Sequence, residues 1–367
     1  MKLLYSCLSR SWGGMEMYTL TSLLALKNNE IEVDLLCYPD SKLHLEAIKY
    51  SVNVVTIKAK SYFHPLQINK VKNTIHKNHY DIVHTHASKD LWILVPALSY
   101  IKKRIPLVLT KHVGSFIVKK DFLHRWVYSR VDLIFAISGI IKKNLFDTCP
   151  VKEKTISILY DGIDTERFKR RDSTSSSVRK EFNISENEIV IGMTGRFSPG
   201  KGQLDFLSCA EVLNKKFNNL KFLIVGEASF SEDDYASEVL LKGKFIHNVI
   251  FTGFRSDIPD VLAVMDIFVF PSHAEAFGMA LVEAMSMELP SVATRSDGVL
   301  DIIDDQHDGL FFENKNNIDL ADKISLLITD QGLRLRLGKA ARGKVLSKFE
   351  LKKVTELLIN YYSNIIN

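Results

Sequence analysis

The sequence predicts an α/β protein built from two doubly wound domains, each with a parallel sheet covered by helices on both faces. Short apolar runs alternate with helical patterns along the chain, and one serine-rich, charged segment over residues 167–187 interrupts this rhythm. Parallel strands that are buried on both faces have this composition, and such domains bind ligands at the carboxyl ends of their strands. We therefore expect two domains that face a cleft.

The predicted domains cover residues 1–166 and 188–346, and the 167–187 segment is interpreted as a linker or exposed loop because it cannot bury an apolar face. The first run is read as a strand and not as a secretory signal, since Arg10 and Trp12 interrupt it and no small-residue cleavage site follows. Strands are expected at 2–8, 32–38, 52–57, 82–85, 107–110 and 133–137, and then at 189–193, 221–225, 249–251, 267–270, 291–293 and 310–311.

The composition is that of a soluble globular enzyme. The chain has 367 residues, of which 46% are hydrophobic and 25% charged, which is enough for two or three domains with full cores. Its four cysteines lie far apart, without the paired spacing of a zinc site. We expect them to be buried thiols in a reducing cytoplasm.

Positive charge is concentrated in the first part of the chain. Residues 1–160 hold 23 lysines and arginines against 12 acidic residues, whereas the remainder holds 25 against 31. Phe116, Phe122, Trp126 and Tyr128 lie among the basic residues. Two interpretations stay open, a solvated basic face and a contact with an anionic membrane or glycolipid. No nucleic-acid-binding motif is present, so no nucleic acid partner is expected.

The most informative stretch covers residues 268–283, F-V-F-P-S-H-A-E-A-F-G-M-A-L-V-E. A buried strand is followed by a loop with Glu275, then by Phe277-Gly278 and a helix that begins at Met279. The glycine allows close backbone approach, the helix start favours an anion, and Glu283 lies about two turns into the helix. A sugar nucleotide needs these groups, as acceptors for sugar and ribose hydroxyls and as a phosphate seat.

Two further glycine turns follow strands. Gly195-Arg196 and Lys201 lie in the turn after the 189–193 strand and offer backbone N–H groups and positive charge to a diphosphate, although in isolation they could be surface charge. Gly13-Gly14, with Glu16, follows the first strand and is a weaker signal of the same kind.

Two aromatic side chains complete the set of candidates. His112 closes the 107–110 strand and lies on the functional edge of the sheet, where a structural histidine is the competing interpretation. His84 and His86 receive no assigned chemistry. Phe254, after another strand of the second domain, would flank a nucleotide base or belong to the core.

The Glu275-x7-Glu283 spacing after strand and proline resembles the signature of the family-4 retaining glycosyltransferases of the GT-B fold. Gly13-Gly14-x-Glu16, the T-x-H pattern ending at His112 and D-G-I-D at 161–164, where the family has N-G-V-D, extend the resemblance over nearly the whole chain. The chain departs from the family pattern at Ser286-Met287-Glu288 and in the loop 296–301.

The resemblance implies a function and a set of roles. A sugar moves from a nucleoside diphosphate, UDP favoured and GDP-mannose next, to a glycolipid or oligosaccharide acceptor in lipopolysaccharide or other surface polysaccharide synthesis. His112, Arg196, Lys201 and Glu275 would act at the reaction centre. Donor contacts are expected from the other candidates, Gly13, Gly14, Glu16, Gly195, Phe254, Phe277, Gly278, Met279 and Glu283.

The resemblance also implies that the last helix, over 347–367, packs back on the first domain. No D-x-D motif occurs, so neither a metal nor another cofactor is expected. The enzyme would be cytoplasmic, with peripheral attachment to the inner face of the membrane. A sugar-nucleotide epimerase of the same fold and a non-catalytic two-lobed sugar-binding protein are the alternatives, and an oxidoreductase is weaker because no G-x-G-x-x-G turn follows a strand.

Overall fold

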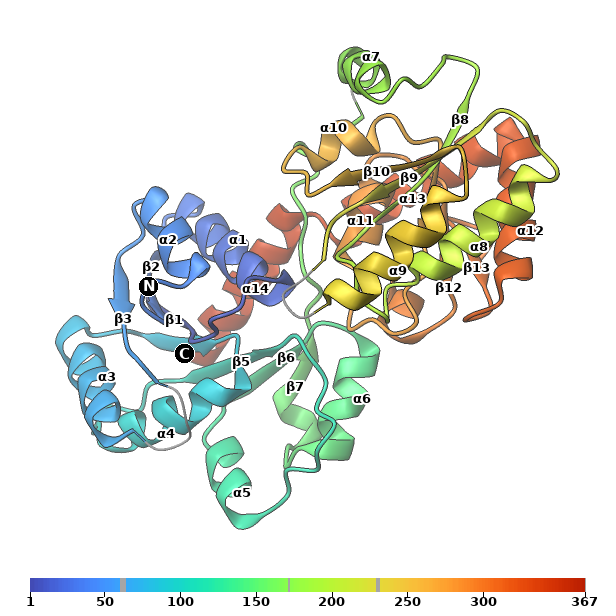
Figure 1. The fold of residues 1–367 in the computed structure, drawn as a ribbon. Coiled ribbons are helices and arrows are strands. Elements are labelled where there is room, and N and C mark those ends of the chain that lie inside the picture. Colours follow the sequence, from blue (N-terminus) through green and yellow to red (C-terminus); the bar gives the residue numbers. More distant parts are fainter. Residues whose placement is uncertain (60–63, 171, 229–231, 367) are drawn as a thin grey trace. The chain divides into compact units, whose positions relative to one another are not determined.

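The computed structural model describes residues 1–59, 64–170, 172–228 and 232–366. The chain forms two compact units, unit 1 with residues Met1–Gly162 and Leu351–Asn367, and unit 2 with residues Ile163–Glu350. Each unit is built around one parallel sheet with helices on both faces, as the alternation of apolar runs predicts (Figure 1).

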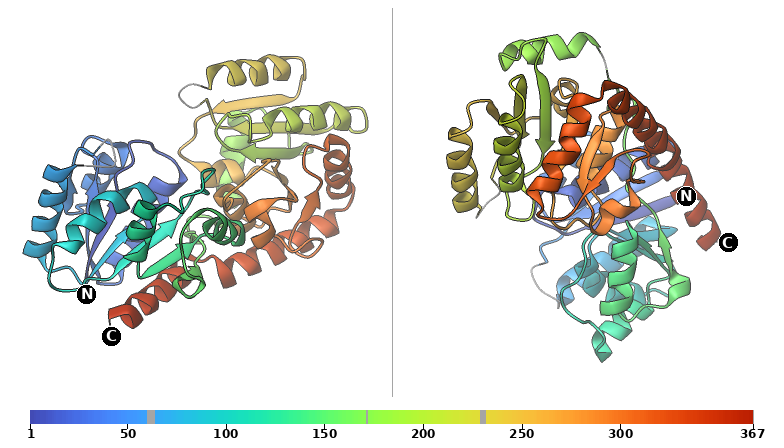
Figure 2. Two further views of the ribbon diagram at one scale, coloured as in Figure 1. Left: turned by 90° about the horizontal axis from the view of Figure 1, so that it is seen from below. Right: turned by 90° about the vertical axis from the view of Figure 1, so that its right-hand side faces the viewer.

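Unit 1 contains a seven-stranded sheet in the order β3-β2-β1-β4-β5-β6-β7. Helices α1, α2 and α14 lie on one side of it and α3 and α4 on the other (Figures 1 and 2). The strands are β1 (Lys2–Cys7), β2 (Glu32–Cys37), β3 (Val54–Thr56), β4 (Ile82–Thr85), β5 (Leu107–Lys111), β6 (Leu133–Ala136) and β7 (Ile156–Ile158). The helices are α1 (Gly14–Asn28), α2 (Lys42–Lys49), α3 (Pro65–Asn78), α4 (Leu91–Ser99), α5 (Phe122–Ser129), α6 (Gly139–Thr148) and α14 (Leu351–Ile366), with 3-10 turns at Ser88–Asp90 and Glu153–Thr155.

Unit 2 contains a six-stranded sheet in the order β10-β9-β8-β11-β12-β13. Helix α8 packs with α9 and α12, and α11 packs with α13. The strands are β8 (Ile189–Thr194), β9 (Leu220–Val225), β10 (Val249–Gly253), β11 (Ile267–Phe270), β12 (Ser291–Thr294) and β13 (Leu310–Phe312). The helices are α7 (Asp172–Glu181), α8 (Gln203–Asn214), α9 (Asp233–Lys244), α10 (Ile258–Leu262), α11 (Met279–Ser286), α12 (Asn317–Thr329) and α13 (Gln331–Lys348), with a 3-10 turn at Asp297–Asp301.

Helix α14 is part of unit 1, although 188 residues of unit 2 separate it from the rest of that unit in the sequence. Its Tyr362 is fully buried, and the Tyr362 hydroxyl lies 2.9 Å from the hydroxyl of Tyr5 in strand β1. The chain enters unit 2 after Gly162 and leaves it after Glu350, a few residues from the predicted crossings at 166 and 346.

The prediction that residues 167–187 form only a linker or exposed loop is wrong, because helix α7 lies within them. Two side chains near the end of α7 hold it to unit 2. Val178 is buried, and Arg179 forms an ion pair of 3.4 Å with Asp266 and donates a hydrogen bond to the Ser185 carbonyl. The serine-rich composition hides this anchoring, because one apolar residue and one arginine supply it.

Both sheets place their first strand between the second and the fourth strand of their unit, β1 between β2 and β4 and β8 between β9 and β11. The strand order therefore reverses next to β1 and next to β8. In open parallel sheets, the loops that follow the two strands at such a switch point diverge and leave space for a ligand. Most of the predicted site residues lie in these loops or at their ends, whereas His112 follows β5 and Phe254 follows β10.

Candidate functional site

In unit 2, the loops after β8 and β11 are locked together. Gly202 ends the first loop with a φ of 76°, and a Cβ atom there would lie 2.2 Å from the carbonyl oxygen of Pro271 in the second loop. The N–H of His273 also donates to the Gly200 carbonyl at 2.9 Å. Only glycine allows both this backbone conformation and this approach.

Lys201 and Glu275, one from each loop, form an ion pair. Both side chains are mostly buried, with 28% and 15% of their surfaces exposed. The sequence predicts a phosphate contact for Lys201 and a sugar contact for Glu275, and the fold brings these two charges to one point at the switch of the sheet. The ion pair places a cation and an anion side by side, and these are the groups that suit phosphate and hydroxyl groups respectively.

The helix after Glu275 begins where the sequence predicts. Gly278 has a φ of 123° and precedes α11, whose first residue is Met279. The first N–H groups of a helix lack partners within the helix and favour an anion. The ring of Phe277, in contrast, is buried against Phe349 with the ring centres 5.5 Å apart, so it belongs to the core of unit 2.

Three other predicted residues of unit 2 follow strands of the same sheet, Gly195 and Arg196 after β8 and Phe254 after β10. Arg196 is exposed in the loop after β8, and its carbonyl accepts a hydrogen bond of 2.8 Å from Gln203. A Cβ atom on Gly195 would meet nothing within 4 Å, so open space adjoins the backbone there. Phe254 follows β10 and is 71% exposed, which excludes the core interpretation for this ring.

The loop 296–301 packs against the backbone of the loop that carries Glu275. The N–H of Gly298 donates to the Glu275 carbonyl at 3.0 Å, and a Cβ on Gly298 would lie 2.4 Å from the Ala276 carbonyl oxygen. The chain departs from the family pattern in this loop, yet it keeps a glycine where the two backbones touch.

Glu283 is half-buried on α11. Desolvation raises the pKa of its carboxyl group to about 7, and the positive charge of Arg167 opposes this shift only in part. Such a perturbed carboxyl group on the helix that starts at the Glu275 loop is typical of a functional position.

In unit 1, the glycine turn after β1 is organised by Glu16. The Glu16 carboxylate is buried and accepts a hydrogen bond of 2.9 Å from the N–H of Gly13, so it fixes the start of α1. Asp90 fixes the other side of the turn, since it accepts hydrogen bonds from the Ser6 hydroxyl at 2.6 Å and from the Leu8 N–H at 3.1 Å. A Cβ on Gly14 would meet nothing within 4 Å. Gly14 thus lies beside open space, whereas Glu16 shapes the loop.

His112 lies at the end of β5 in a row of buried polar side chains. Its Nε2 atom is 3.0 Å from Nδ1 of His86, and its Nδ1 atom is 3.5 Å from Oδ2 of Asp161. The rings of His86 and His112 are stacked, with centres 5.3 Å apart. Sequence reasoning left His86 unassigned and missed the pairing with Asp161, although the aspartate in D-G-I-D, in place of the family's asparagine, is its signal.

Burial favours the neutral form of His84 in β4 and of His86, which follows that strand. It lowers the pKa of His84 to about 3 and that of His86 well below the usual range. His84 is hydrogen-bonded to Tyr362 and to Thr110, at 2.5 and 2.8 Å, and so belongs to the core. Nε2 of His86 and Oδ1 of Asp161 have no hydrogen-bond partner in the described part of the chain. Both are buried, and such atoms are uncommon away from functional sites.

Known proteins match this chain over both units. Residues 12–167 match the family model described as Glycosyltransferase Family 4, and residues 175–344 match the model described as Glycosyl transferases group 1. The chain belongs to the family-4 glycosyltransferases. The protein is therefore a glycosyltransferase, and its family is one that retains the configuration of the transferred sugar.

Two bacterial relatives align with this glycosyltransferase over nearly its full length. The UDP-Gal:alpha-D-GlcNAc-diphosphoundecaprenol alpha-1,3-galactosyltransferase of Escherichia coli is 25% identical, over 96% of this chain and 94% of the relative. The N,N'-diacetylbacillosaminyl-diphospho-undecaprenol alpha-1,3-N-acetylgalactosaminyltransferase of Campylobacter jejuni is 25% identical over 98% of each chain.

Solved structures establish the fold of the glycosyltransferase. Anabaena HepE, in complex with UDP and glucose, superposes with a TM-score of 0.84 at 23% identity, over 99% of each chain. A glycosyltransferase from Rickettsia africae superposes with a TM-score of 0.90 at 20% identity, over 100% of this chain and 98% of the other. The two α/β units thus form the GT-B fold.

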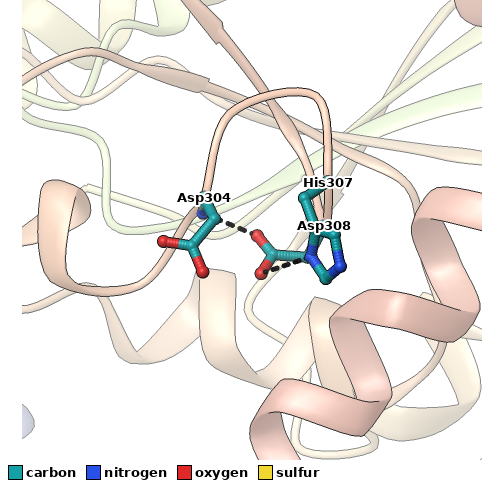
Figure 3. A group of neighbouring side chains, drawn as sticks. All are labelled: Asp304, His307 and Asp308. Carbon is teal, nitrogen blue, oxygen red and sulfur yellow. Dashed lines mark hydrogen bonds and ion pairs between the residues drawn. The ribbon is translucent and has the colours of Figure 1, made fainter.

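Within the described residues of the glycosyltransferase, Asp304, His307 and Asp308 form a group with metal-ligand composition before β13 (Figure 3). A lysine already compensates their charge. Nζ of Lys344 lies 2.8 Å from a carboxylate oxygen of Asp304 and 3.0 Å from one of Asp308. The hydrogen bond from Lys344 holds the pKa of Asp304 below its usual range. The Asp308 carboxylate also accepts the N–H of Asp304 at 2.8 Å, so the group closes a turn and we assign no metal to it.

Proposed function

We propose that this glycosyltransferase moves a sugar from a UDP-sugar to a hydroxyl group of a lipid-linked glycan during assembly of a surface polysaccharide. The observation that carries the donor part is the Lys201–Glu275 pair at the switch point of the unit 2 sheet, followed directly by the start of α11. A cation and a helix start suit the diphosphate, and a carboxylate suits the sugar hydroxyls.

The choice of UDP and of a lipid-linked acceptor is supported by the relatives. The Escherichia coli relative is named for UDP-galactose and an undecaprenol-linked sugar, and Anabaena HepE binds UDP and glucose. GDP-mannose is the next candidate donor. We assign the acceptor to unit 1 and the hexosyl donor to unit 2.

The proposed reaction needs no protein nucleophile. The bond between the anomeric carbon and the diphosphate oxygen breaks as the acceptor oxygen bonds to the same face of that carbon. The acceptor proton passes to the departing phosphate oxygen. Arg196, Lys201 and the N–H groups at the start of α11 stabilise the charge that develops on the diphosphate, a role that could otherwise require a metal ion. Glu275 holds the donor sugar and Glu283 the ribose.

UDP-sugars are expected to raise the melting temperature of the enzyme more than GDP- or ADP-sugars do. A ligand that binds only the folded state stabilises it by about 2.7 kcal/mol at 100 times its Kd, so at equal concentration the nucleotide sugar that binds most tightly gives the largest shift. Thermal shift with a panel of nucleotide sugars measures this. Lys201→Ala should remove the shift. Lys215→Ala, at the far end of α8, is the matched control and should keep it. Stabilisation by none of the panel would contradict the proposal, and a new sugar nucleotide formed without acceptor would indicate an epimerase.

Donor affinity should increase as the pH rises through about 7, the pKa of Glu283. Below that pH the carboxyl group is protonated, and above it the carboxylate accepts hydrogen bonds from ribose hydroxyls more strongly. Calorimetric titration with UDP between about pH 6 and pH 8 measures the effect. Glu283→Gln should bind UDP more weakly and with a flatter pH dependence. An unchanged pH dependence in this variant would show that Glu283 does not contact the ribose.

A further inference from the structure

The segment that follows His112, residues 113–126, exposes an unusual number of large apolar side chains. Phe116 is completely exposed and Phe122 is 81% exposed. The other exposed apolar side chains of the segment are Val113, Ile117, Val118, Leu123 and Trp126. Single exposed apolar residues are normal on soluble proteins, but seven within fourteen residues mark an interaction surface.

Hydrogen bonds at its base hold the 113–126 segment in place. Oδ1 of Asn144, on α6, accepts the N–H of Ser115 at 2.6 Å, and Nδ2 of Asn144 donates to the Ser115 carbonyl at 3.0 Å. The N–H of Lys119 donates to the Thr148 carbonyl at 2.6 Å, also on α6. These bonds fix the backbone at Ser115 and at Lys119, and the apolar side chains between the two anchors, at 116–118, are exposed.

Helix α5 continues the surface and is apolar on two faces. Val127 and Tyr128 are buried in unit 1, whereas Phe122, Leu123 and Trp126 are exposed. Arg125 and Ser129 are the polar residues exposed beside them. Large apolar side chains exposed together on one helix in this way are typical of a binding surface.

The charge of the segment indicates what covers it. Lys119, Lys120 and Arg125 lie among the apolar residues, against a single acidic residue, Asp121, which caps α5 and is paired with His124. Aromatic and aliphatic side chains mixed with lysine and arginine are typical of segments that insert into the headgroup region of an anionic bilayer. A protein partner would also suit the apolar residues, but it would not require this excess of positive charge.

We propose that the 113–126 segment is a membrane-docking surface, which inserts its apolar side chains into the interface of an anionic lipid bilayer. The inference rests on the proposed function and deepens it. The segment begins one residue after His112, so docking places that edge of unit 1 at the membrane, where a lipid-linked acceptor is held. In the described part of the chain, no helix is long and apolar enough to cross a bilayer, so the segment would attach the enzyme peripherally.

Flotation of the full-length enzyme with vesicles tests the docking surface. We expect binding to phosphatidylcholine vesicles that contain phosphatidylglycerol, weaker binding without the anionic lipid, and a loss at high salt. The variant Phe116→Ser/Phe122→Ser should bind at least about tenfold more weakly, because each aromatic side chain loses its burial. Lys119→Glu/Lys120→Glu should weaken binding to the anionic vesicles and leave binding to the neutral vesicles unchanged. Leu241→Ser/Phe245→Ser removes exposed apolar side chains from unit 2 and should bind like the wild type.

UDP-sugar binding, measured by thermal shift on the same variants, separates this inference from the proposed function. Wild-type vesicle binding that is lost in the 113–126 variants, with an intact nucleotide-sugar shift, supports docking. Equal binding by the wild type and these variants, or no vesicle binding by the wild type, overturns the docking surface and leaves the proposed reaction standing. A change in self-association, but not in vesicle binding, would reassign the segment to a protein interface.

Discussion

Lys201→Ala is expected to lower the rate of sugar transfer by about 100- to 1,000-fold, the loss seen when one preorganised group that stabilises developing charge is removed. Lys201 is the charged group that the locked loops after β8 and β11 hold against Glu275. When the ligand is bound, the same ammonium group would face the diphosphate, whose negative charge rises as the bond to the sugar breaks. Steady-state transfer to a lipid-linked acceptor measures the loss.

Glu275→Gln separates the two members of the pair. It keeps the shape of the side chain and removes its charge, so we expect slower transfer with weakened discrimination between donor sugars, while UDP alone still binds. Both variants need a folding control, because each leaves its mostly buried partner uncompensated. The double variant Lys201→Ala/Glu275→Gln leaves no uncompensated charge at this position, so it serves as that control. If all three variants transferred sugar at the wild-type rate, the site assignment in unit 2 would be wrong.

Much of the fold follows from patterns that are local in the sequence. The short apolar runs identify the strands, and the glycines and charges that follow them lie at the carboxyl edge of each sheet, since all strand pairs within the two sheets are parallel. The position of Glu275 next to Lys201 is different in kind. It depends on β11 lying beside β8, which the sequence order does not reveal.

The missed features share a physical cause, namely contacts between residues far apart in the chain. Helix α7 is held by the ion pair between Arg179 and Asp266, and His112 is paired with an aspartate 49 residues later. Neither contact has a local signal beyond the identity of single residues. The burial of Phe277 likewise depends on Phe349, so a motif position that the family resemblance places at the donor contributes its ring to the core.

His112→Ala is expected to reduce kcat by about 100-fold and to leave UDP binding unchanged, because His112 lies in unit 1 and we assign it to the reaction centre. Its two ring nitrogens lie near Asp161 and His86, which fix the orientation of the ring. His247→Ala, on an exposed histidine of unit 2, is the matched control and should retain full activity.

Asp161 should act through His112, which makes it a positioning residue. Asp161→Ala removes the group beside Nδ1 of His112 and is expected to cost about tenfold in kcat, as observed elsewhere for partners that orient a functional histidine. Asp161→Asn keeps an oxygen at this place and restores the family's residue, so it should recover most of the rate. Nitrogen NMR of labelled imidazole reports which ring nitrogen of His112 carries the proton. If Asp161→Ala lowered the rate without changing that signal, Asp161 would serve the fold of the turn and not the histidine.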